Sequence, residues 1–170
     1  MSALLARFLR SAAPFALLVA LGPARAVEAD PADVASVDAI IAAYYEVVSG
    51  PAGAVPDIER DRSLHHPDAW VAIIREASDG ERMVMRGGLD DYYGIEPGGA
   101  PAPREAGFFE WETDREVRRS GDMVHAWSAY ESAPTPDGPA TARGVNSINL
   151  YWDGARWWIM GWMFDSTLDE

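Results

Sequence analysis

Three polar residues in the C-terminal half of the chain, His125, Ser147 and Asn149, are of types that could act on a small molecule. Histidine titrates close to neutral pH, so His125 could serve as a general acid or base. Asn149 could hold a carbonyl or hydroxyl group, and Ser147 shares its side of a strand because strand side chains alternate. These residues predict either acid–base chemistry or polar recognition in an apolar cavity.

Each of these side chains also has a structural interpretation. The turn before its strand decides where His125 points. A two-residue turn at Ser120-Gly121 places it opposite Glu116 on the charged side of a sheet, and a three-residue turn places it opposite Val117. In the structural interpretation His125 is a surface histidine, while Ser147 and Asn149 face solvent or an interface. A general base must first have the right geometry, so these alternatives stay open.

Other polar groupings fit ordinary structure better than a site. Tyr44 and Tyr45 lie on the apolar face of an expected helix. Each could be a core residue whose hydroxyl finds a partner at the edge of the core, or a catalytic hydrogen-bond donor. Adjacent histidines point apart, so residues 65–68 do not predict a metal site. The acidic alternation over residues 110–116 predicts a solvated strand face and lacks the loop of a calcium site. We expect no metal and no cofactor.

Composition excludes several classes of protein. The chain has 170 residues, with 27 acidic side chains against 14 Lys plus Arg, and its net charge of -13 argues against nucleic-acid binding. A hydrophobic content of 48% is sufficient for the core of a single domain. The chain has no cysteine, which excludes disulfides, thiol catalysis and cysteine-ligated metals.

Residues 1–26 have the three parts of a secretory signal peptide. Two arginines come first, an apolar run too short to span a membrane follows, and Ala24-Arg25-Ala26 gives the cleavage pattern. An uncleaved N-terminal anchor is the alternative. We expect a periplasmic or secreted protein in which residues 27–170 form one domain that contacts no membrane after cleavage.

The elements that must position these side chains are helices first and strands afterwards, which is the α+β pattern. Asp30 reads as the cap of an amphipathic helix that extends to Val48 and is stopped by Gly50-Pro51. Short elements are expected at residues 57–64 (helix), 65–69 (turn), 70–74 and 83–85 (strands) and 87–94 (a turn of helix). Four long antiparallel strands are expected at residues 108–119, 123–131, 141–152 and 156–164.

A two-residue turn at Asp153-Gly154 would set the register of the last hairpin. One face would then carry polar groups among large apolar side chains, which is the composition of a ligand cavity. The expected ligand-binding residues are Tyr45, Ser147, Asn149, Trp158, Met160 and Trp162. The other face is also apolar, so we expect a homodimer through the sheet.

Three features together resemble the SnoaL-like group of the nuclear transport factor 2-like superfamily. They are the Tyr44-Tyr45 pair, the His66-Pro67-Asp68-Ala69 sequence and the segment Asp153-Gly154-Ala155-Arg156-Trp157-Trp158-Ile159. The resemblance implies a cone-shaped α+β fold, in which a curved antiparallel sheet wraps an N-terminal helix and encloses an apolar cavity. It also implies a fold that often dimerises through its sheet.

Two kinds of chemistry in this superfamily can be compared with the chain. In the ketosteroid isomerase kind, the position of the carboxylate base falls near Ile73, and the strand at 141–152 has no second acid. In the scytalone dehydratase kind, a His and a later Ser-x-Asn pair resemble His125, Ser147 and Asn149. That kind also pairs its His with a second His and an Asp, and only His65 or His66, in a turn expected at the edge of the cone, could be the second His. We therefore expect a non-catalytic module that binds a small apolar molecule; the alternative is a lyase or isomerase that uses His125 with Asn149 and Tyr45.

Overall fold

A computed structural model of the chain describes residues 28–76 and 80–167. The expected signal peptide, residues 1–26, lies outside these residues. Among the helices described, none is long and apolar enough to cross a membrane. The helices are α1 (Val37–Val48), α2 (Ile58–Leu64) and α3 (Leu89–Tyr93). The strands are β1 (His65–Glu76), β2 (Arg82–Gly87), β3 (Phe109–Ser120), β4 (Met123–Ala133), β5 (Ala142–Trp152) and β6 (Trp157–Thr167).

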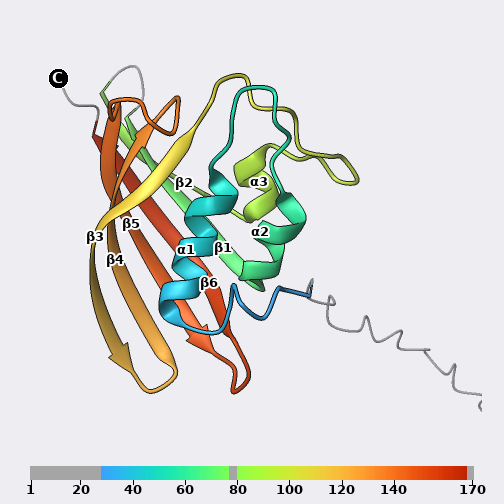
Figure 1. The fold of residues 1–170 in the computed structure, drawn as a ribbon, viewed down its shortest axis with the longest axis vertical. Coiled ribbons are helices and arrows are strands. Elements are labelled where there is room, and N and C mark those ends of the chain that lie inside the picture. Colours follow the sequence, from blue (N-terminus) through green and yellow to red (C-terminus); the bar gives the residue numbers. More distant parts are fainter. Residues whose placement is uncertain (1–27, 77–79, 168–170) are drawn as a thin grey trace, which may run out of the picture.

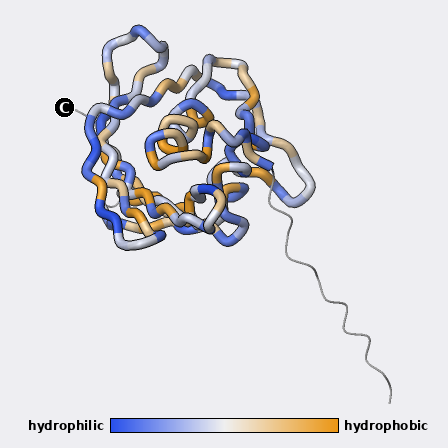
Figure 2. Tube along the Cα trace, turned by 60° about the horizontal axis from the view of Figure 1, so that its bottom comes forward, coloured by the Kyte–Doolittle hydropathy of each residue, from blue (hydrophilic) through white to orange (hydrophobic). Residues whose placement is uncertain are grey.

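The six strands form one curved sheet in the order β2-β1-β6-β5-β4-β3. Strands β3 to β6 are an antiparallel meander, and β1 joins the edge of β6 in parallel. The sheet curves around α1, which lies at the centre of the fold (Figures 1 and 2). This architecture confirms the α+β fold with a curved sheet around an N-terminal helix.

Helix α1 begins six residues later than the sequence pattern suggested, because Ser36 and not Asp30 is its cap. The Ser36 side chain accepts a hydrogen bond from the Ala39 N–H (3.0 Å), whereas Asp30 accepts one from the Ala32 N–H in a preceding turn. The residues of α1 that are buried against the sheet and the other helices are Ile40, Ile41, Ala43, Tyr44, Tyr45, Val47 and Val48.

The sheet has an inner face, which packs against α1, and an outer face on its other side. Alternation along β4 and β5 puts Val124, Ala126, Ile148 and Leu150 in the core. The neighbouring residues point outward, and Trp127, with 51% of its surface exposed, is one of them. The two faces therefore decide which residues can reach an internal cavity.

The predicted register of the last hairpin is wrong. Trp152 pairs with Trp157, so the connection has four residues (153–156) instead of two. A bulge between Asn149 and Leu150 shifts the pairing again, and Ser147 faces Met163 while Ile148 faces Trp162. The longer loop moves the pairing by two residues and leaves the faces unchanged, whereas the bulge is a one-residue shift that places Trp162 on the same face as Ile148.

The segment at residues 65–69 was expected to be a turn, but it is the first part of β1. His65 pairs with Ile159 of β6, and its side chain is buried with 4% of its surface exposed. The expected elements at 57–64, 70–74, 83–85 and 87–94 and the four long strands are confirmed, with ends that differ by a few residues.

Candidate functional site

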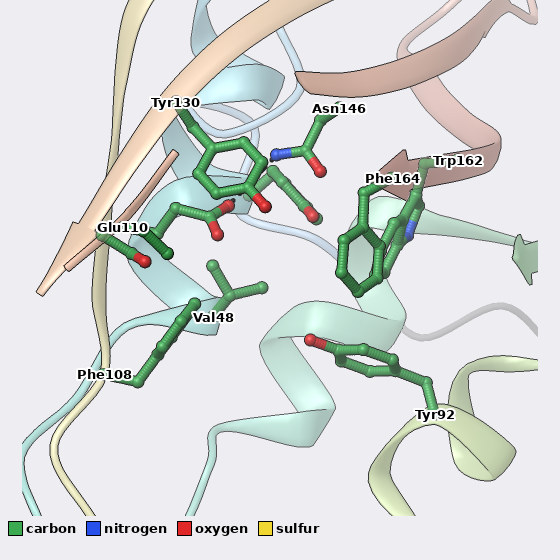
Figure 3. A pocket seen from close by; sticks show the side chains of 11 residues that line it. Val48, Tyr92, Phe108, Glu110, Tyr130, Asn146, Trp162 and Phe164 are labelled. Atoms are coloured by element: carbon green, nitrogen blue, oxygen red, sulfur yellow. Dashed lines mark hydrogen bonds between the residues drawn. The ribbon is translucent and has the colours of Figure 1, made fainter. Parts of the chain in front are cut away.

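A cavity of about 220 Å³ lies between the inner face of the sheet, α1 and α3. Its wall is mostly aromatic, and Figure 3 shows how the side chains converge on it from different elements. The lining residues are Tyr44, Val48, Tyr92, Phe108, Glu110, Tyr130, Ser132, Ala142, Asn146, Trp162 and Phe164. This is the composition of a small-molecule site, with an apolar wall and a few polar groups.

Glu110 is the only acidic or basic side chain in that wall. A bulge in β3 between Glu112 and Asp114 changes which face the residues occupy: Glu110 and Glu112 point inward, whereas Asp114 and Glu116 are exposed. The expectation of a solvated acidic face is therefore wrong for its first two members. Burial raises the pKa of Glu110 to about 7, although a hydrogen bond from Asn146 opposes the rise.

Asn146, on the inner face of β5, joins Glu110 to helix α1. Its side chain is buried with 1% exposed, and its Nδ2 donates to Glu110 Oε1 (3.1 Å) and to the Tyr45 hydroxyl (3.3 Å). Both hydrogens of the amide are thus used inside the protein. The two bonds orient the amide and, through it, the carboxyl of Glu110.

A chain of polar contacts continues from Tyr45 to the surface. The Tyr45 hydroxyl lies 2.6 Å from Ser128 Oγ, and Ser128 donates to Glu112. Glu112 accepts two hydrogen bonds from Arg115 (2.8 and 2.6 Å), whose guanidinium also pairs with the exposed Asp38. Each buried side chain in this series of contacts, from Tyr45 to Arg115, therefore has a hydrogen-bond partner, as burial requires.

The tyrosines around Glu110 stay neutral at physiological pH. Burial raises the pKa of Tyr45 to about 12, and it also raises the pKa of Tyr44 and Tyr130 above the ordinary value. Their hydroxyls can therefore donate or accept hydrogen bonds but do not supply a charge. Glu110 is the group in the cavity whose charge can change near neutral pH.

Trp162 is the centre of the aromatic wall. Its ring lies 5.5 Å from Tyr44, 5.0 Å from Tyr92 and 5.5 Å from Phe164. Its indole N–H donates to His65 Nε2 (3.0 Å), so the proton of the neutral His65 ring is on Nδ1, 2.9 Å from the Asp61 carbonyl oxygen. His65 therefore fixes the orientation of the Trp162 ring through this hydrogen bond.

The residues predicted to do acid–base chemistry lie together, but on the outer face of the sheet. His125 pairs across strands with Arg118 and Asn149, and its Nε2 is 2.9 Å from Ser147 Oγ. The turn has two residues, as in one of the two alternatives, but it lies one position later, at 121 and 122, so His125 lies opposite Arg118 instead of Glu116 or Val117. The hypothesis that His125 and Asn149 open into the internal cavity is wrong, since the hairpin register directs them away from it.

Of the six expected ligand-binding residues, Trp162 lines the cavity. Trp158 lies on the outer face, where Arg156 stacks 3.6 Å from its ring centre and His66 packs at its edge. Met160 is at the hairpin bulge and, like Ser147, Asn149 and Tyr45, is not part of the wall. Tyr45 acts on the cavity indirectly, through Asn146.

Sequence reasoning missed Glu110 and Asn146, and two signals could have suggested them. Alternation along β5 places Asn146 on the same face as Ile148, and a bulge in an acidic strand brings some of its carboxylates inward. Among the described residues, no cluster of three or more His, Asp or Glu could hold a metal ion.

Comparisons with known proteins give no activity for this chain. No family model and no curated protein matches the chain. One similar solved structure is an NTF2-like protein of unknown function from Shewanella baltica, with 10% identity, a TM-score of 0.46 and coverage of 79% of this chain and 98% of that one. Another is the Kfla4162 protein from Kribbella flavida, with 14% identity, a TM-score of 0.49 and coverage of 80% and 91%.

The chain has the nuclear transport factor 2-like fold that the sequence resemblance implied, since its meander curves around α1. Membership of the SnoaL-like group remains a prediction.

Replacing Tyr45 with Phe should destabilise the protein, because Asn146 would lose an acceptor and Ser128 a partner in a buried position. We expect the free energy of unfolding in urea to fall by about 1–2 kcal/mol. Tyr151→Phe is the control, since Tyr151 is 41% exposed on the outer face and should change little. Equal effects of the two substitutions would contradict the proposed role of Tyr45.

Replacing Glu110 with Gln should stabilise the protein at alkaline pH. Its raised pKa means that the folded state holds the proton more tightly, so stability is fully present below the ordinary value of 4.5 and is lost as the pH rises through about 7. Near pH 8 we expect the free energy of unfolding in urea of Glu110→Gln to exceed that of the wild type by up to about 3 kcal/mol. Near pH 5 the two proteins should have similar free energies of unfolding.

Glu116→Gln is the matched control for that measurement, because it makes the same chemical change at an exposed position of the same strand. It should not alter the pH dependence of unfolding. A Glu110→Gln variant that is less stable than the wild type near pH 8 would show that the carboxylate is stabilising there.

Proposed function

We propose that this protein binds a small, mostly apolar molecule that carries a polar group, in the cavity bordered by Glu110. The observation that carries the proposal is a cavity of about 220 Å³ in which Glu110 and Asn146 stand among six aromatic side chains. A carboxyl that only stabilised the fold would gain nothing from burial without a charged partner. The arrangement is therefore best explained by a ligand that uses this carboxyl.

A second function, a lyase or isomerase, is favoured by one further observation. Burial raises the pKa of Glu110 to about 7, which suits a group that takes and returns a proton near neutral pH. In this hypothesis Glu110 replaces His125 as the acid–base residue, and Asn146 orients its carboxyl. The two functions share one cavity and differ in whether the bound molecule is changed.

Export to the periplasm or the medium remains our proposal for where the protein acts, based on the sequence of residues 1–26. These residues lie outside the described part of the chain. In that location the negative charge of the protein would favour solubility and disfavour contact with anionic membrane surfaces.

Binding should be visible in the intrinsic fluorescence of Trp162, which lies in the cavity wall. We expect saturable changes in tryptophan emission with small aromatic alcohols and amines in the wild type. Ala142→Phe should abolish them, because Ala142 lines the cavity and a phenyl ring would occupy it. Val145→Phe adds the same ring to the same strand outside that wall and should leave binding unchanged; equal binding by both variants would refute the cavity as the site.

We also propose that the outer face of the sheet forms a homodimer. Its exposed apolar side chains support this, since Met123, Trp127 and Tyr151 are 64%, 51% and 41% exposed. Sedimentation equilibrium should give twice the mass of the chain, and Trp127→Glu should give the monomer. Val55→Glu, a change at an exposed apolar loop residue, should remain dimeric; a monomeric wild type would exclude the proposal.

A further inference from the structure

The polar atoms that the cavity leaves for a ligand are mainly hydrogen-bond acceptors. Asn146 uses both Nδ2 hydrogens inside the protein, and within the described residues nothing donates to its Oδ1. Glu110 accepts its one described side-chain bond at Oε1, which leaves Oε2 for a ligand. Figure 3 shows the Asn146 amide and the Glu110 carboxyl on the same side of this space. A ligand that donates hydrogen bonds fits these groups best.

The charge and the aromatic wall restrict the donor further. The wall has no lysine or arginine among its residues. Arg115 lines a second hollow together with Glu110, but its guanidinium pairs with Glu112 and Asp38. Six of the eleven lining residues are aromatic, and aromatic rings attract cations as well as apolar groups. The whole chain, with a net charge of -13, also attracts positive ligands toward its surface.

We propose that the ligand is a small organic amine, bound as its ammonium ion, whose charged group pairs with Glu110 while its apolar part contacts the aromatic wall. This inference rests on the proposed function and specifies the chemical class of the ligand. The pair would be a charge-assisted hydrogen bond in a water-poor site, where such bonds are strong. Asn146 keeps the carboxyl oriented toward the ammonium group.

Proton exchange links amine binding to pH. Without ligand, Glu110 holds a proton up to about pH 7, because burial raises the pKa of its carboxyl. Binding of an ammonium ion favours the ionised carboxylate, so the proton is released to solvent. The other titratable or charged groups around Glu110 are Tyr44, Tyr45 and Glu46 of α1, Tyr92 of α3, Glu112 and Arg115 of β3 and Tyr130 of β4.

The test compares three probes that share a phenyl ring and differ in their polar group: phenethylamine, phenethyl alcohol and phenylacetate. Their affinities are measured by calorimetry with the full chain over a range of pH. We expect the amine to bind at least about tenfold more tightly than the alcohol near pH 8, and its affinity to fall about tenfold per pH unit below pH 7. Proton release should make the binding enthalpy below pH 7 depend on the buffer.

Glu110→Gln should remove the preference for the amine and the proton release, while affinity for the alcohol stays within about twofold. Glu116→Gln, with the same change on an exposed part of β3, should bind like the wild type. Binding of the alcohol or phenylacetate without preference for the amine would overturn the inference and leave the cavity as the site. If none of the three probes binds to the wild type, both the inference and the proposed function are overturned.

Discussion

The structure depends on one constraint: an apolar enclosure that contains polar groups must give each of them a partner. Asn146 meets this constraint for three elements at once, because its amide joins β5 to Glu110 on β3 and to Tyr45 on α1. The bond to Tyr45 continues through Ser128 to Glu112, so helix and sheet are fixed to each other by polar contacts as well as by packing. A carboxyl can then be held at the cavity wall in a defined orientation.

A second polar group holds the opposite wall in the same way. His65 lies at the start of β1 and accepts the indole hydrogen of Trp162, the residue around which Tyr44, Tyr92 and Phe164 pack. Aromatic rings in a loose arrangement would fill the space beneath them, whereas rings with fixed positions can line an open cavity. The volume of the cavity and the position of its carboxyl therefore have separate structural supports, one on each side.

Much of the fold could be predicted because hydrophobic periodicity and turn residues are local signals. The apolar spacing along α1 and the four long segments separated by turn residues at 120–122, 134–139 and 153–154 led to the correct class and meander. Of the candidate site, the same reasoning identified Trp162, whose size and apolar character suit a buried wall. It failed for His125, Ser147 and Asn149, whose types suggested chemistry but whose positions are on the outer face.

The sequence by itself determined the α+β class, the order of the strands in the meander and an aromatic interior, since these follow from residue type and spacing. Only the tertiary structure decided which face of the sheet lines the cavity and which residues share that face, because the bulge in β3 and the bulge in the last hairpin each shift the alternation. Such bulges depend on how strands that are separated in the sequence pair with each other, which local sequence patterns do not specify. For that reason Glu110 and Asn146, two ordinary polar residues in the sequence, became the polar groups of the cavity.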